Sequence, residues 1–96
     1  MENREKVTPD IIEVNALEEY LLYIKFSTNE ERIYDMKELI KDNKFYINLK
    51  DLEYFKKVKT RGESVEWNNG EDICPENLYY DSIEIENFKG KIKRLD

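Results

Sequence analysis

The chain has no histidine, one cysteine, two prolines and three glycines among its 96 residues. Without histidine it cannot form a Ser-His or Cys-His catalytic pair of its own, nor a histidine-ligated zinc or iron site. Its single cysteine, Cys74, excludes an intrachain disulfide. Acidic neighbours in the sequence also disfavour the Cys74 thiolate. We therefore expect a protein that is not an enzyme and that has no cofactor and no metal site.

Long hydrophobic runs are also missing. The longest apolar stretch, from Tyr20 to Ile24, is far too short to span a bilayer. The first residues, Met1 to Lys6, are charged, and no apolar run follows them as a signal peptide requires. A lone thiol is typical of a reducing compartment. The sequence therefore predicts a cytoplasmic protein without membrane contact.

Charge is abundant, and it is unevenly distributed. Charged residues make up 40% of the chain, and the formal net charge of −6 argues against direct binding of nucleic acid or an anionic membrane. Residues 62–88 contain no lysine or arginine but eight acids: Glu63, Glu66, Glu71, Asp72, Glu76, Asp81, Glu84 and Glu86. One interpretation is a solvated face, offset by the bases of residues 56–61 and the C-terminal tail. The other is a surface for a cationic protein partner.

The first half of the chain has the pattern of a three-stranded antiparallel meander. Residues 11–16, 20–26 and 32–36 are apolar and β-branched or aromatic, and polar turns separate them. In the middle strand Leu22, Ile24 and Phe26 share one face. In the first strand the two-residue period places Ile12 and Val14 on one face and Ile11 on the other.

The second half predicts short helices and hairpins. Asp35 is a candidate cap for a helix that ends at residue 41, and residues 45–47 are predicted to be a short extended piece. Asn48 or Asp51 can cap a second helix, which would have Leu49, Leu52 and Phe55 on one face. Strands over residues 56–60 and 64–67 follow. The Asn-Gly at residues 69–70 favours a hairpin with residues 71–74, and the segment from Pro75 to Tyr80 suits a helical turn with proline at its first position.

Residues 82–96 differ in character. Acids alternate with isoleucines in the first part, and bases surround Ile92 in the second. Two outcomes are open: an extra hairpin that pairs the acidic part with the basic part, or a frayed tail. We therefore divide the chain into a flexible N-terminus (1–8), one α+β domain (9–81) and a C-terminal extension (82–96). The domain should hold a small antiparallel sheet, a meander plus a C-terminal hairpin, with two or three short helices.

A motif over residues 65–79 resembles the closing segment of the small bacterial family called domain of unknown function 2442. The match comprises Trp67, Gly70, Asp72, Pro75, Glu76, Leu78 and Tyr79. Upstream, Pro9, Phe26 and Asp35 occur in the family's order. The polar turn at residues 28–31 lacks the family's usual Asp-Gly, and the tail lies outside the pattern. The resemblance implies a small α+β domain without established activity, sometimes encoded beside another small protein in suspected toxin–antitoxin pairs.

Several motif residues have competing roles. Trp67 is either a core aromatic or a contact aromatic at a hot spot. Asp72 and Glu76 either stabilise the start of the helix at Pro75, or contact a ligand, a cation or a partner, or form an acid/base pair. Leu78 should fill the core. Tyr79 and Tyr80 are adjacent helical residues and cannot both point inward.

The functional hypothesis is a non-enzymatic protein-interaction module that binds another protein. The partner class is a basic protein that is the cognate member of a toxin–antitoxin-like pair. The candidate partner-binding residues are Glu63, Glu66, Trp67, Asp72, Glu76, Tyr79 and Tyr80. The alternative is a small-molecule or metal sensor that uses Asp72 and Glu76. A homodimer through the tail, with Ile83 and Ile85 extending a sheet, is a further possibility.

Overall fold

A computed structural model describes residues 8–95. The prediction of a flexible N-terminus therefore falls almost entirely outside the described residues. Its last member, Thr8, is buried and donates a hydrogen bond to Glu63 Oε1 at 3.1 Å. Thr8, which the prediction assigned to the flexible N-terminus, is therefore packed against the domain.

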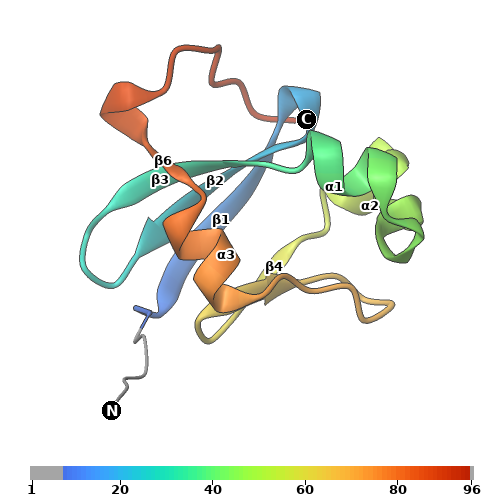
Figure 1. Cartoon of the computed structure of the whole chain (residues 1–96), viewed down its shortest axis with the longest axis horizontal. Helices are drawn as coiled ribbons and strands as arrows, with labels where there is room; N and C mark the ends of the chain where they lie inside the picture. The colour runs from blue at the N-terminus through green and yellow to red at the C-terminus, as the bar shows by residue number, and fades with distance from the viewer. Residues whose placement is uncertain (1–7, 96) are drawn as a thin grey trace.

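An antiparallel sheet organises the fold (Figure 1). Its spatial order is β1-β2-β3-β6, and a two-stranded sheet, β4-β5, lies beside it. The strands are β1 (Ile11–Leu17), β2 (Leu21–Phe26), β3 (Glu31–Asp35), β4 (Lys59–Arg61), β5 (Ser64–Glu66) and β6 (Ile83–Glu84). The helices are α1 (Lys37–Asp42), α2 (Leu52–Phe55) and α3 (Pro75–Tyr80), with 3₁₀ turns η1 (Glu18–Tyr20), η2 (Lys44–Lys50) and η3 (Ile85–Asn87). The predicted α+β class and the meander are confirmed.

One face of the sheet carries the main core. As predicted, Leu22, Ile24 and Phe26 of β2 point to the same side, and all three are fully buried. The helical segments, the small sheet and α3 cover this face with further buried side chains: Ile40, Tyr46, Leu49, Phe55, Val65, Trp67, Ile73 and Leu78. The alternate apolar side chains of β2 therefore form the centre of the main core.

The predicted faces of β1 are wrong at its first residues. The β1–β2 register shifts between Ile11, which pairs with Phe26, and Glu13, which pairs with Lys25. This bulge adds one residue opposite the partner strand. As a result Ile11 enters the core, whereas Ile12 is 57% exposed.

We expect the two isoleucines to respond differently to the same change. Ile11→Val should lower the free energy of unfolding by about 0.5–1.5 kcal/mol, because it removes a buried methylene. Ile12→Val should change it by less than about 0.5 kcal/mol, because that side chain is in solvent. Urea denaturation of both variants measures this difference. Equal losses would contradict the bulge.

Two other expectations are corrected, and one open alternative is decided. Residues 45–47 are not extended but part of η2, where the Asn43 side chain accepts a hydrogen bond from Phe45 N at 2.9 Å and so caps the turn. Asp51, not Asn48, caps α2 by accepting from Glu53 N at 3.0 Å. Leu49 and Phe55 are buried, but Leu52 at the start of α2 is 43% exposed.

The tail is neither a self-paired hairpin nor a frayed end. Its acidic part forms β6, which pairs antiparallel with β3 through Arg32–Glu84 and Ile33–Ile83. Its basic part bonds the end of β1, where Glu18 N donates to Lys93 O at 2.8 Å and Leu95 N donates to Ala16 O at 3.1 Å. The tail therefore occupies both outer edges of the sheet within one chain. Ile83 pairs with Ile33 on the inner side of β6, and within residues 8–95 no further strand pairs with its outer side.

Candidate interaction surface

The helix α3 is positioned by one buried residue and by its proline. Pro75 begins the helix, where its missing N–H costs nothing. Leu78 is fully buried and anchors the helix to the core, as predicted. The expected capping by Asp72 is wrong: Cys74 is the cap residue, and no side chain of residues 8–95 caps the helix. The Asp72 carboxylate instead lies 3.3 Å from Arg61 Nη1. Glu76 is in the first turn, as expected for an acid near a helix N-terminus.

A guanidinium fixes the other end of α3 to the sheet. Arg32 Nε donates to Ser82 Oγ at 2.7 Å, and Nη2 donates to the Ser82 carbonyl at 2.8 Å. The guanidinium carbon lies 5.2 Å from the centre of the Tyr79 ring, a cation–π geometry. Its Nη1 also contacts Glu30 at 3.4 Å and Glu84 at 3.9 Å. The side chain of Arg32 is only 15% exposed, so these contacts are partly shielded from water.

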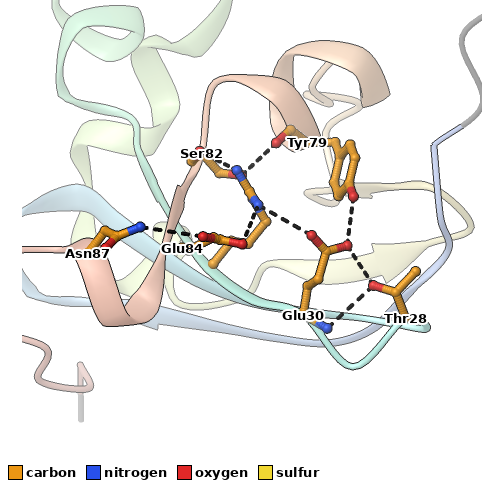
Figure 2. A network of polar contacts seen from close by, with 7 residues as sticks. Thr28, Glu30, Tyr79, Ser82, Glu84 and Asn87 are labelled. Atoms are coloured by element: carbon orange, nitrogen blue, oxygen red, sulfur yellow. Dashed lines mark hydrogen bonds and ion pairs between the residues drawn. The ribbon is translucent and has the colours of Figure 1, made fainter.

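Figure 2 shows this network, in which Glu30 lies between Thr28 and Tyr79. The Tyr79 hydroxyl donates to Glu30 Oε1 at 2.6 Å, and Thr28 Oγ1 donates to the same oxygen at 2.7 Å. The hydrogen bond from Tyr79 is the main reason that the pKa of Glu30 lies below its usual value. The same bond is the main reason that the pKa of Tyr79 is raised. The turn before β3 is thereby tied to α3.

We expect Glu30→Gln to remove a pH-dependent part of the stability. Because the folded state lowers the pKa of Glu30, its contribution is complete above the unfolded pKa of about 4.3 and is lost as the pH falls through the folded value. The free energy of unfolding of the wild type should exceed that of the variant by about 1 kcal/mol at pH 7, and this difference should shrink towards pH 2.5. Urea denaturation across this range measures it. Glu38→Gln, an exposed acid on α1, is the control, and a pH-independent difference would contradict the mechanism.

The adjacent tyrosines face different ways, as expected. Tyr79 is half-buried, and its ring packs edge-on against Phe26 at 5.0 Å. Tyr80 is 51% exposed, and its ring lies edge-on to that of Tyr79 at 5.0 Å. We call the outward residues Glu76, Asn77, Tyr80 and Asp81 the α3 surface. It combines an exposed aromatic ring with two carboxylates.

The eight acids of residues 62–88 do not form one uniform face. Glu66 contacts Lys59 and Arg61, Asp72 contacts Arg61, and Glu84 contacts Arg32. Glu63 accepts the hydrogen bond from Thr8. Within residues 8–95, no basic side chain lies within 4 Å of the carboxylates of Glu76, Asp81 or Glu86. Of the eight acids, those at α3 and η3 therefore have neither a base nor a side-chain hydrogen bond within the described residues, whereas Glu63 and Glu71 have hydrogen bonds from neutral groups.

Glu71 is a residue that the sequence did not single out. It is only 3% exposed and accepts hydrogen bonds from the Tyr54 hydroxyl at 2.7 Å and from Asn48 Nδ2 at 3.2 Å. Both partners lie on the η2 and α2 segments, so Glu71 joins the 68–71 turn to the helical layer. Its role is structural, and nothing in the local sequence distinguishes it from the exposed acids around it.

Trp67, one of the candidate contact residues, is inside the protein. It is 1% exposed, stacks on Phe55 with ring centres 5.9 Å apart, and donates from Nε1 to the Phe55 carbonyl at 2.9 Å. The next residues form the predicted Asn-Gly turn, with Gly70 at a φ of 102° and Trp67 N donating to Glu71 O at 2.9 Å. Trp67 is therefore a core residue that packs beneath the Asn-Gly turn, and its side chain is not accessible to a partner.

An open hollow of about 500 Å³ lies between the β4–β5 turn and the start of α3. Asp72, Cys74 and Glu63 line it, but Trp67 and Tyr79 do not. Asp72 is already paired with Arg61 there. Across residues 8–95, no three His, Cys, Asp or Glu side chains are grouped as a metal ion would need. In the same part of the chain, no helix is both long and apolar enough to cross a membrane.

Comparison with known proteins adds one finding. The model of a family described as "Protein of unknown function (DUF2442)" matches residues 11–84. That range includes the whole main sheet, the Arg32 network and α3. No curated protein and no solved structure matches the chain.

Proposed function

Because this chain belongs to the DUF2442 family, whose description assigns no activity, we propose its function from its own surface. We propose that it is a non-enzymatic module that binds a basic surface of another protein through the α3 surface. A small cognate protein, as in a toxin–antitoxin-like pair, is the partner class that the sequence resemblance suggests. The observation that carries the proposal is the exposed ring of Tyr80 beside Glu76 and Asp81. The carboxylates of Glu76 and Asp81 have no basic side chain within 4 Å among the described residues.

The surroundings of α3 support this role. An interface works best when its contact groups are held in place before binding, because less ordering is then needed. Leu78 anchors α3 from inside, and the Arg32 network holds its C-terminal end. Partially exposed tyrosines are typical of interface centres, and unpaired carboxylates at a rim attract basic partners.

We expect the two kinds of residue to affect different rate constants. Replacing both Glu76 and Asp81 by their amides should lower the association rate constant about tenfold at low salt and flatten its salt dependence. Tyr80→Ala should instead raise the dissociation rate constant about tenfold. The partner is first captured from the native host and identified, and kinetics on the purified pair give both constants.

A matched control removes the same charge elsewhere. Glu38→Gln with Asp42→Asn, both exposed on α1, should leave the association rate nearly unchanged. An equal loss in this control would mean that net charge, not the α3 surface, governs encounter. An acidic partner, binding that strengthens with salt, or a stable homodimer that captures nothing would each contradict the proposal.

A sensor of a small molecule or metal is the second candidate. The hollow beside Asp72 is the observation that favours it. It ranks lower because Arg61 already compensates the Asp72 carboxylate, and because Glu76, its expected companion, does not line the hollow.

A further inference from the structure

The second face of the sheet is covered by a segment that lies outside the family match. The match ends at residue 84, and the segment that follows, residues 85–95, we call the strap. In Figure 1 it is the red chain that arches from β6 to the end near the β1–β2 turn. Beneath it lies a small apolar cluster of three buried side chains: Leu17, Leu21 and Ile33.

The strap has few attachments. Ile85 and Phe88 are only partly buried where they pack on the apolar cluster. At the other end, two backbone hydrogen bonds join residues 93 and 95 to the end of β1, and Arg94 contacts Glu13 at 3.8 Å. Residues 89–93 between these ends are exposed. Local opening is favoured in segments with so few buried contacts.

The sheet face is also wider than the strap that covers it. On one side a hollow of about 500 Å³ is lined by Leu21, Ile83 and Phe88 among others. On the other side a hollow of about 330 Å³ is lined by Leu17, Tyr23, Ile85 and Ile92 among others. Both hollows have apolar side chains from the sheet and from the strap, so the face has room for a larger occupant.

Charge around the face complements the strap. The strap contains four bases, Lys89, Lys91, Lys93 and Arg94, and one acid, Glu86. On one side Arg94 contacts Glu13 at 3.8 Å. On the other side Lys89 and Lys91 line the same hollow as Glu18 and Glu19, and as Asp35, which is paired with Lys37. The strap thus shows, within the chain, the chemistry that this face accepts: apolar residues separated by bases.

We propose that the second face of the sheet is a docking groove for a basic segment of a partner protein, with apolar residues spaced as Ile85, Phe88 and Ile92 are. The strap occupies this groove in the free protein, and the partner's segment displaces it. This surface is distinct from the α3 surface and does not depend on it. An attached segment acts at a high effective concentration, so the partner must compete with it. Loosening the strap should therefore strengthen binding, because the apparent affinity scales with the open fraction.

The probe is a fluorescein-labelled synthetic peptide with the sequence of residues 85–95, titrated with the full chain and followed by fluorescence anisotropy. Phe88→Ala, which removes the central apolar anchor of the strap, should bind the peptide at least tenfold more tightly than wild type. Arg94→Glu is the second variant. The Arg94 side chain is 68% exposed, so this substitution removes the ion pair with Glu13 without disturbing the core. The variant should bind the peptide at least threefold more tightly than wild type.

Two controls sharpen the result. A peptide with all four bases replaced by glutamate should bind neither variant. The variant with Glu76→Gln and Asp81→Asn should bind the peptide as the wild type does. A failure of the proposed groove can therefore be distinguished from a failure of the proposed α3 surface. Equal affinity of wild type and both variants, or equal binding of the charge-reversed peptide, would overturn the inference. A concentration-dependent dimer of Phe88→Ala that excludes the peptide would also overturn it, since the occupant would then be a second copy.

Discussion

Trp67→Ala should lower the free energy of unfolding by about 3–5 kcal/mol, the usual cost of deleting a large buried aromatic side chain. The substitution leaves a cavity against Phe55 and deprives the Phe55 carbonyl of its hydrogen bond from the indole N–H. Total stability of a small domain is about 5–15 kcal/mol, so the variant should be close to unfolding at 37 °C. Urea denaturation followed by far-UV circular dichroism measures the loss.

Two further variants separate packing from location. Trp67→Phe keeps a ring in the core but loses the hydrogen bond, so we expect a loss of about 1–3 kcal/mol. Tyr80→Ala removes an exposed ring from the same motif and should cost less than about 1 kcal/mol. A loss below about 1 kcal/mol for Trp67→Ala would be incompatible with its position and would return Trp67 to the list of contact residues.

Arg32→Ala should lower the free energy of unfolding by about 2–3 kcal/mol. The change removes both charge-assisted hydrogen bonds to Ser82 and leaves Glu30 without its base. Ser82 is buried, so water cannot fully replace the lost donors. The C-terminal end of α3 should therefore loosen, which amide hydrogen exchange at residues 78–82 detects beside the urea denaturation.

Comparison with two other arginine variants makes the result specific. Arg32→Lys keeps the charge but cannot supply the forked donors, so it should recover less than half of the loss. Arg94→Ala breaks an exposed ion pair and should cost less than about 1 kcal/mol. If Arg32→Ala left hydrogen exchange in α3 unchanged, the guanidinium would not be what holds this helix.

The stability and binding effects of Arg32 are connected through α3. A loosened helix holds Tyr80 and the carboxylates less firmly, so partner binding should weaken although none of these groups is replaced. Sequence reasoning did not identify Arg32. One signal was present in the sequence. Arg32 and Tyr34 are two residues apart in the predicted strand, so their side chains point to the same face. A base on the core-facing side of a strand needs polar partners.

Some of the fold followed from local patterns. The alternation in β2 predicted three side chains that are fully buried, and Pro75 predicted the start of α3, because both depend only on neighbouring residues. The Asn-Gly turn and the opposite orientations of Tyr79 and Tyr80 are of the same kind. The order of motif residues from Trp67 to Tyr79 also indicated the family, which the match over residues 11–84 confirms.

Other features depended on contacts between distant segments, and here the local patterns were insufficient. The bulge at Ile12 shifts the face of β1 by one residue, and a strict two-residue period does not encode it. The tail pairs with β3 and with the end of β1, although its own acidic and basic parts looked complementary.

The sequence by itself therefore determined the class of the fold, the buried face of its central strand and the absence of any histidine chemistry. Only the tertiary structure decided which charges stay unpaired. Acids that look equivalent along the chain are distinguished by what lies opposite them: Arg61 beside Asp72, Tyr54 beside Glu71, and no base of the described chain beside Glu76. Those partners come from 11 and 17 residues away in the first two cases, and the fold alone brings them together.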